Sequence, residues 1–338
     1  MLLEVPVTAR SDCFYRWRRE QEVICFPVRA SKFCDLVSAA KNVTGFIGRI
    51  AKIGVNNLII KGTAMKLRNS LAAAITALTI SGAASAETIK IAVWYTDPAA
   101  QHTGDISVMV DNLISTSNRI YENNGLDIQL ELVDSREYSK DDLLINRANL
   151  DEFSGLAEYF AQDSTPTYDE ITQVAPGPVG VQRQLFEADM VALLGKGEEV
   201  WENGRFQGTR CGVAWSGIGS DGVMHPSAKR LAYSLTAVDC GGTDLTFIHE
   251  LGHNMGLTHS RQQGDTSGGV YYWGLGYGVN NSFSTIMAYP SAFGRGAVRL
   301  DTFSDPDKIC SGFPCGQRDR ADAHRALGPI IDDVAGYY

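Results

Sequence analysis

The most informative stretch of this sequence runs from His249 to His259 and reads His-Glu-Leu-Gly-His-Asn-Met-Gly-Leu-Thr-His. It holds three of the chain's six histidines. If residues 245–255 form a helix, His249 and His253 lie on one face of it, about 6 Å apart along the axis. Two imidazole rings at this spacing can bind a single metal ion.

The rest of the stretch supplies a base and a third ligand. Glu250 lies about 100° around the helix from His249, so its carboxylate stands beside a bound ion rather than among the ligands. A continuous helix would carry His259 about 9 Å past His253 and about 240° around the axis, out of reach. The chain must therefore turn, and Gly256 can adopt the positive φ that ends a helix without a Cβ penalty. We expect this turn to bring His259 back to the ion.

The pattern indicates a catalytic zinc site. Three neutral histidines leave one position of a zinc ion open, which is typical of catalytic rather than structural sites. The predicted reaction is peptide hydrolysis by metal-activated water, with one Zn²⁺ as cofactor and Glu250 as general base; structural calcium is left open. One alternative is a catalytically silent binding or adhesin module stabilised by the same zinc. Another is a zinc hydrolase of non-peptide amides, although an extended strand edge at residues 212–219 favours peptides.

The stretch resembles the long zinc motif of the metzincin zinc endopeptidases at every specified position. This resemblance implies a Met-turn, and residues 284–289, Ser-Thr-Ile-Met-Ala-Tyr, are similar to it. Met287 would then be the apolar floor of the site, and Tyr289 a weak extra ligand or a transition-state donor. The sequence departs from the family at Ser260, where relatives often have aspartate.

Further segments resemble the bacterial reprolysin-like enzymes, specifically the peptidyl-Asp metalloendopeptidases. They are residues 91–96, 186–194, 303–316 and 321–324. The resemblance covers nearly all of residues 88–338 and implies a secreted zinc endopeptidase that favours acidic residues at the cleavage site. Such a preference needs a cation near the Met-turn, and Arg295 and Arg299 are the candidates.

Apolar periodicity predicts alternating strands and helices. Strands are expected at residues 88–95, 127–133, 188–194, 212–219 and 233–238, helices at 105–121, 141–160 and 245–255, and a loop at 165–180. The alternation predicts an α/β fold with a mostly parallel sheet and packed helices, and the resemblance implies a metzincin-like twist. We expect an upper lobe at residues 87–259, a smaller irregular lower lobe at 260–338, and substrate between them.

The charge of the chain changes near residue 86. Residues 1–86 contain 12 Lys and Arg against 5 Asp and Glu, a net charge of +7, whereas residues 87–338 contain 18 against 34, a net charge of −16. An acidic body lacks the basic stripe that binding to a phosphate backbone requires. We therefore expect no nucleic-acid partner. The expected partners are protein or peptide substrates, and the oligomeric state is left open, with a monomer favoured.

Residues 65–86 have the pattern of a secretory signal peptide, with a basic start, an apolar run and three small residues at 84–86. The run is too short to span a bilayer, so no membrane anchor is expected. Because signal peptides act from the start of a chain, residues 1–64 are interpreted as a non-native upstream extension; the alternative is a genuine domain with an internal apolar helix. The mature protein would begin at Glu87 and be secreted or periplasmic.

Four cysteines remain after this cleavage, and Cys13, Cys25 and Cys34 would be lost with the leader. An even number of cysteines in an oxidising compartment favours disulfides over metal ligands. Four cysteines allow three pairings. We favour Cys310 with Cys315, closing the turn between them, and Cys211 with Cys240.

Overall fold

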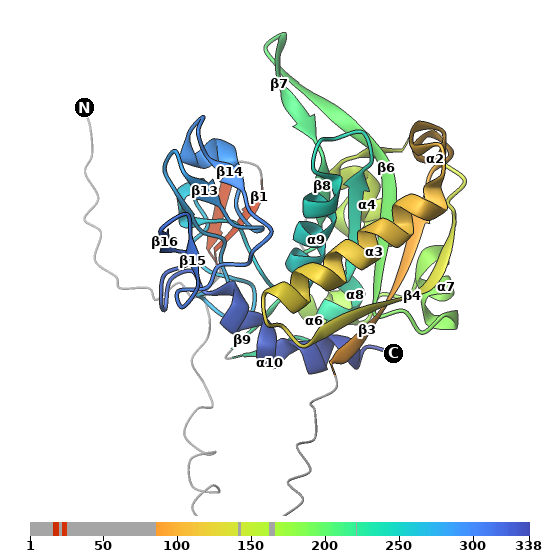
Figure 1. Ribbon diagram of the computed structural model, residues 1–338. Coiled ribbons are helices and arrows are strands. Elements are labelled where there is room, and N and C mark those ends of the chain that lie inside the picture. The colour runs from red at the N-terminus through yellow and green to blue at the C-terminus, as the bar shows by residue number, and fades with distance from the viewer. Residues whose placement is uncertain (1–15, 20–21, 26–85, 141–142, 162–165, 221) are drawn as a thin grey trace, which may run out of the picture. The chain divides into compact units, whose positions relative to one another are not determined.

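The computed structural model describes residues 16–19, 22–25, 86–140, 143–161, 166–220 and 222–338 (Figure 1). These residues belong to two compact units, residues 1–79 and 80–338. In the first unit, β1 (Arg16–Arg19) and β2 (Glu22–Cys25) form an antiparallel pair. Cys13, Cys34 and the predicted signal peptide up to residue 85 lie outside the described residues. The predictions for residues 1–86 therefore stay predictions.

A mixed sheet forms the centre of the second unit. Its main strands, in spatial order, are β4 (Ile128–Glu137), β3 (Glu87–Tyr95), β6 (Met190–Glu202), β11 (Tyr233–Ala237) and β8 (Gly212–Ala214). The first four run parallel, whereas β8 at the edge is antiparallel to β11. Two shorter strands, β5 (Leu144–Ile145) and β7 (Arg205–Arg210), pair with the C-terminal half of β6. The predicted α/β fold with a mostly parallel sheet is confirmed.

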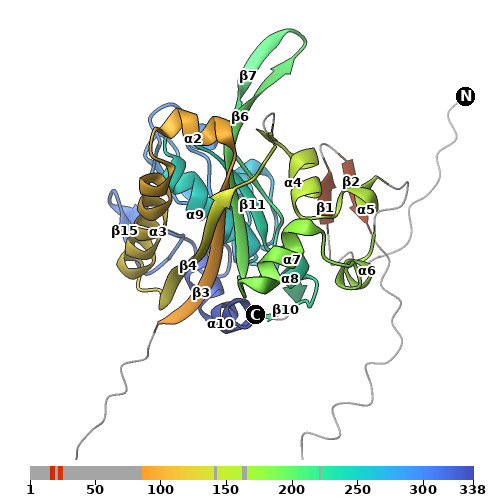
Figure 2. The same cartoon turned by 90° about the vertical axis from the view of Figure 1, so that its right-hand side faces the viewer.

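Alternating apolar side chains explain why both faces of this sheet are covered. Along β3, Ile89, Ile91 and Val93 are buried in one core, whereas Ala92 and Trp94 are buried in a second. Successive side chains of a strand point to opposite faces, so one strand can contribute to two cores. Figure 2 shows the consequence, with α3 and α9 on one side of the sheet and α4 and α7 on the other.

The helices divide between the two faces. The first face is covered by α2 (Asp97–Thr103), α3 (Ile106–Asn123), α9 (Thr243–Asn254) and α10 (Ala323–Ala335). The second is covered by α4 (Arg147–Phe153), α5 (Ala157–Phe160), α6 (Tyr168–Thr172) and α7 (Pro178–Leu185). The short helix α8 (Ala228–Leu231) contributes to both cores. Within the part of the chain that the structure describes, none of the helices is long and apolar enough to cross a bilayer.

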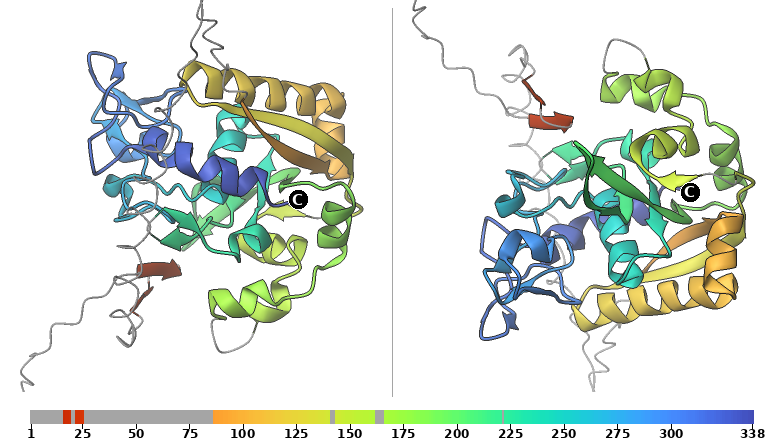
Figure 3. Two further views of the ribbon diagram at one scale, coloured as in Figure 1. Left: turned by 90° about the horizontal axis from the view of Figure 1, so that it is seen from below. Right: turned by 90° about the horizontal axis from the view of Figure 1, so that it is seen from above.

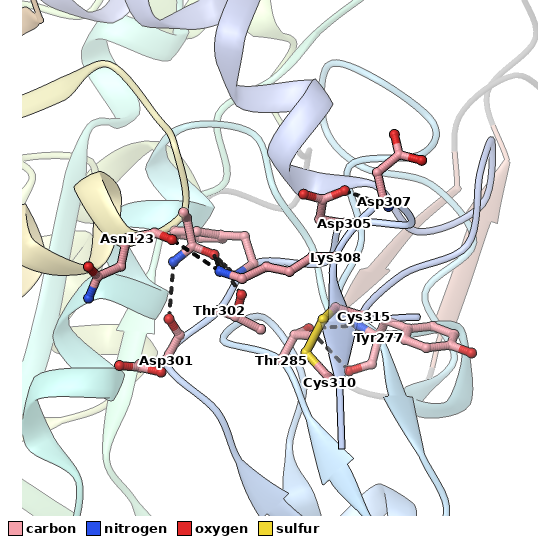
Figure 4. Close-up of a disulfide and its surroundings, with 12 residues drawn as sticks. Asn123, Tyr277, Thr285, Asp301, Thr302, Asp305, Asp307, Lys308, Cys310 and Cys315 are labelled. Atoms are coloured by element: carbon pink, nitrogen blue, oxygen red, sulfur yellow. Dashed lines mark hydrogen bonds between the residues drawn. A yellow bond between two sulfur atoms is a disulfide. The ribbon is translucent and has the colours of Figure 1, made fainter. Parts of the chain in front are cut away.

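Residues between α9 and α10 have little regular structure, as their many glycines predict. The elements here and before β11 are short: β9 (Gly219–Ser220), β10 (Val223–Met224), η3 (Arg261–Gln263), β12 (Gly278–Val279), β13 (Phe283–Ser284), η4 (Pro290–Phe293), β14 (Val298–Arg299), β15 (Ile309–Cys310) and β16 (Phe313–Pro314). Lys308 Nζ donates to the Asn123 carbonyl oxygen at the end of α3, next to the Cys310–Cys315 disulfide (Figure 4). Helix α10 then returns to pack on β3 (Figure 3). The division into lobes at residue 259 stays a prediction.

Two secondary-structure predictions on the second face were wrong. The helix expected at residues 141–160 is replaced by β5, α4 and α5, because Gly155 adopts a φ of +73° and interrupts it. The loop expected at residues 165–180 contains α6 and the start of α7. Thr167 and Glu170 form a capping box that begins α6.

Candidate metal centre

Helix α9 carries the first two histidines and ends where the sequence predicts a turn. Leu257 N donates to Gly252 O at 2.9 Å and Gly256 N donates to His253 O at 2.9 Å, the hydrogen bonds of a Schellman motif. Gly256 has a φ of +81°, which glycine adopts without the steric cost that a Cβ imposes. The predicted turn at Gly256 is therefore present, and it directs the chain back toward α9 at His259.

The three histidines of the motif converge. His253 Nε2 lies 3.1 Å from His249 Nε2 and 3.2 Å from His259 Nε2. The potential ligand atoms of all three lie within 4.8 Å of one another. His249 and His253 are buried and His259 is half-buried. The structure thus brings together the three residues that the spacing of the motif selects.

Oxygen atoms fix the orientation of the two helical histidines. His249 Nδ1 lies 2.7 Å from the Ile286 carbonyl oxygen, and His253 Nδ1 lies 2.9 Å from the Leu257 carbonyl oxygen. Because a carbonyl oxygen only accepts, each Nδ1 carries the hydrogen and donates it. The lone pairs are then on the Nε2 atoms, which is the tautomer that a metal ligand requires.

These residues fit a zinc ion. Burial lowers the pKa of His249 well below its usual range and that of His253 to about 3, so both rings are neutral. Lone pairs on nitrogen atoms 3.1 Å apart would repel one another unless a cation lay between them. Neutral imidazoles are common ligands of zinc, and three of them leave room for one more.

Glu250 lies beside the histidines and is almost completely buried. It is 3% exposed, and its Oε2 has no hydrogen-bond partner among the described residues. Burial raises the pKa of its carboxyl to about 8, and the Arg299 guanidinium opposes this effect. A Cβ at Gly212, the first residue of the edge strand β8, would overlap the Glu250 carboxylate. The absence of a side chain at Gly212 therefore lets the sheet edge approach the carboxylate.

The segment that resembles a Met-turn also packs against the histidines. Met287 is fully buried, and a Cβ at Gly252 would overlap its sulfur atom. Because Gly252 lies between the two helical histidines, Met287 touches the turn of α9 that carries them. The ring of Tyr289 lies 5.5 Å from that of His249 and 4.8 Å from that of His259, measured between centroids.

The two arginines proposed to bind an acidic substrate side chain differ in position. Arg299 Nη2 lies 3.1 Å from His249 Nδ1, and its guanidinium carbon lies 5.9 Å from the centre of the Tyr289 ring. The Arg299 Nε is buried and has no hydrogen-bond partner among the described residues. Arg295 is exposed, on the loop after η4. Arg299 is therefore the arginine with an unused donor beside the histidines.

The region that contains this site matches a known protein family. Residues 108–260 match the model of the reprolysin-like metallopeptidase family M12B. This region is similar to a reprolysin-like metallopeptidase domain. The matched region includes Glu250 and the three histidines, and it ends at Ser260.

Several proteins named peptidyl-Asp metalloendopeptidase are similar to this chain. The one from Pseudomonas aeruginosa is 34% identical over 291 residues, which are 80% of this chain and 44% of that protein. Those from Xanthomonas campestris and Stenotrophomonas maltophilia are 28% and 27% identical, over 75% and 74% of this chain and 52% of each relative. The chain thus spans about half the length of the curated relatives it matches.

A solved structure described as a chaperone-substrate complex is similar in fold alone. Its TM-score is 0.51 at 18% sequence identity, over 75% of this chain and 36% of that chain.

One polar partner of the histidines was missed by sequence reasoning. Asp265 Oδ2 accepts from His259 N at 2.8 Å and lies 3.3 Å from His259 Nδ1, so it orients the third ring. The neighbouring Ser260 donates to Gln263 Oε1 at 2.8 Å, and the same oxygen accepts from Tyr289 N at 3.0 Å. No spacing rule indicates Asp265, because a loop rather than a helix brings it back to His259.

Both predicted disulfides, Cys211–Cys240 and Cys310–Cys315, are present in the second unit. Cys211 immediately precedes β8, and Cys240 lies just before α9. The first disulfide therefore ties the edge strand to the segment that leads into the histidine-bearing helix. Closing a loop with a sequence separation of 29 contributes about 3 to 4 kcal/mol to stability in the chain-entropy model.

Proposed function

We propose that the reprolysin-like domain is a zinc-dependent endopeptidase that favours acidic residues at the cleavage site. The observation that carries this proposal is the group of three histidine Nε2 atoms, 3.1 and 3.2 Å apart, with the buried and unpaired Glu250 oxygen at its side. The names of the relatives agree with it. A silent binding module would use the same histidines but would gain nothing from an unpaired buried carboxylate, which costs stability.

Each residue has its own part in this mechanism. His249, His253 and His259 would hold a zinc ion, which would supply a Lewis acid to polarise the peptide carbonyl and activate water. Glu250 takes a proton from the water and returns it to the leaving amine, so no covalent acyl-enzyme forms. The open edge of β8 binds the substrate as an added strand through backbone hydrogen bonds. Tyr289 stabilises the transition state or acts as a weak extra ligand, and Met287 is the apolar floor.

Metal analysis combined with peptide cleavage tests this function. We expect about one zinc ion per chain and cleavage within a broad peptide library. A chelator should abolish the cleavage, and added zinc should restore it, because the histidines hold the only metal that the mechanism uses. A folded, zinc-containing protein that cuts nothing in the library would favour the binding-module alternative.

Arg299 is expected to recognise the acidic side chain of the substrate. Replacing it by glutamine should lower kcat/KM for a peptide with Asp at the cleavage site by about 10- to 100-fold, the range for a lost charge-assisted hydrogen bond. A matched peptide with Asn should change by less than about threefold. The ratio of kcat/KM for the Asp peptide to kcat/KM for the Asn peptide separates charge recognition from a structural effect on His249, which would lower both. Arg295→Gln is the control, and an unchanged Asp preference in Arg299→Gln would contradict the assignment.

We also propose that the protein is exported by the segment at residues 65–86 and acts as a secreted or periplasmic monomer. The two disulfides support an oxidising compartment. N-terminal sequencing of the exported protein should give Glu87 as its first residue. A product that begins well before Glu87 would contradict this cleavage site.

A further inference from the structure

Strands β6 and β7 form a long hairpin that projects from the sheet. Glu202 pairs with Arg205 at its end, and Asn203 and Gly204 have φ values of 50° and 73°. Two positive φ values in a two-residue loop identify the tight turn that suits the twist of a hairpin. Figures 1 and 2 both show the hairpin extending beyond the other elements of the second unit.

Two large aromatic side chains lie exposed near the tip. Trp201 and Phe206 are directly opposite each other in the register, and their ring centroids are 5.5 Å apart in an edge contact. Trp201 is 59% exposed and Phe206 is 53% exposed. Exposed aromatic pairs are costly in solution and are enriched where proteins bind partners.

The base of the hairpin is fixed to the rest of the domain. Gly197 N donates to Asp239 Oδ1 at 2.8 Å, and Arg210 forms an ion pair with Glu198 across the two strands. The Cys211–Cys240 disulfide follows directly. These bonds hold the hairpin in a set direction, so the aromatic pair has a defined position relative to β8.

The direction of the chain indicates where the Trp201–Phe206 pair lies relative to Glu250. Strand β7 leads through Cys211 into β8, whose first residue, Gly212, packs against Glu250. A peptide that adds to β8 in the more stable antiparallel orientation runs from Ala214 toward Gly212. Its C-terminal part then continues from Glu250 toward the hairpin. Phe206 lies six residues before Gly212, about 20 Å at the rise of a strand.

We infer that Trp201 and Phe206 form an accessory substrate site that binds an apolar side chain about six residues C-terminal to the scissile bond. The inference rests on the proposed endopeptidase function and deepens it. A polypeptide segment fits better than an anionic lipid or nucleic acid surface, because Glu199 and Glu202 beside the pair outweigh the single cation next to it, Arg205. The reprolysin-like domain would then favour long, unfolded chains over short peptides.

Three synthetic peptides with one common cleavage sequence test the inference on the zinc-loaded full chain. The first ends three residues after the scissile bond. The second extends to ten residues, with Leu and Phe at positions five to seven, and the third has serine there. We expect kcat/KM for the apolar long peptide to exceed the other two by about tenfold. In the double variant Trp201→Ser, Phe206→Ser this advantage should disappear, while cleavage of the short peptide stays within about twofold.

Leu185→Ser is the matched control. Leu185 is 70% exposed at the end of α7, before β6 begins, so its loss should leave the tenfold advantage intact. An advantage that survives in the double variant, or is absent from the unmodified protein, overturns the inference and leaves the peptidase function standing. A zinc-loaded protein that cleaves none of the three peptides, nor any in a broad library, overturns both.

Discussion

Glu250→Gln is expected to lower kcat for peptide cleavage by about 10³-fold while leaving one zinc ion bound. A general base contributes about 10²- to 10⁴-fold to such a rate. Glutamine keeps the size of the side chain but cannot take the proton. The three histidine Nε2 atoms are oriented by Ile286, Leu257 and Asp265 rather than by Glu250, so the metal site should be unaffected. Single-turnover cleavage measures the rate of the chemical step, and metal analysis of the same preparation measures the zinc content.

Stability separates this effect from misfolding. The Glu250 carboxylate is buried and one of its oxygens is unpaired, which opposes folding. Because burial raises the pKa of this carboxyl to about 8, folding near pH 7 must either protonate it or bury its charge. A neutral amide avoids that cost, so the thermal midpoint of Glu250→Gln should equal or exceed that of the unmodified protein. Glu122→Gln, at an exposed position on α3, is the control. A decrease in kcat of less than tenfold with full zinc content would exclude Glu250 as the base.

The parts of the fold that sequence predicts are those set by local periodicity. Alternation of Ile89, Ile91 and Val93 with Ala92 and Trp94 is visible in the sequence, and the structure buries both sets. The break near residue 155 was missed, because glycine within an apolar pattern is compatible with both a helix and an interruption. The close approach of Gly177 to Gly155, which accompanies the break, is a tertiary contact.

In the site, too, some features follow from local sequence and others depend on tertiary contacts. The spacing of residues 249–259 predicts the helix, the turn at Gly256 and the return of His259. Helix geometry puts the first two histidines on one face, and Gly256 permits the turn that the third one needs. The oxygens that orient the rings come from Ile286 and Asp265 in loops, where sequence separation says nothing about distance. The apposition of Gly212 and Glu250 likewise depends on how β8 packs on α9.

The β6–β7 hairpin could have been predicted from the sequence. Asn203-Gly204 between two extended segments is a strong indicator of a two-residue hairpin turn. The strand predicted at residues 188–194 therefore extends to Glu202 and turns back along β7. What sequence alone does not show is that Trp201 and Phe206 remain exposed, since aromatic residues in strands are more often buried.

His253→Ala is expected to abolish zinc binding and peptide cleavage together. His253 is the central member of the cluster, within 3.1 and 3.2 Å of the other two Nε2 atoms, so its loss leaves two histidines that cannot hold zinc with comparable affinity. Cleavage should fall more than about 10³-fold. His102→Ala, which removes an exposed histidine on α2, should retain zinc and activity.

Thermal unfolding with and without zinc identifies the cause of that loss. Free zinc at 100 times its dissociation constant stabilises the folded state by about 2.7 kcal/mol, or about 5 to 10 °C for a domain of this size. The unmodified protein and His102→Ala should show this shift, and His253→Ala should not. In chelator His253→Ala should unfold at a lower temperature than the other two, because it also loses the buried hydrogen bond to the Leu257 carbonyl oxygen. The zinc-dependent shift of each protein is therefore measured from its own midpoint in chelator. A full zinc-dependent shift in His253→Ala would mean that the ion binds elsewhere, and the assignment of the three histidines would fail.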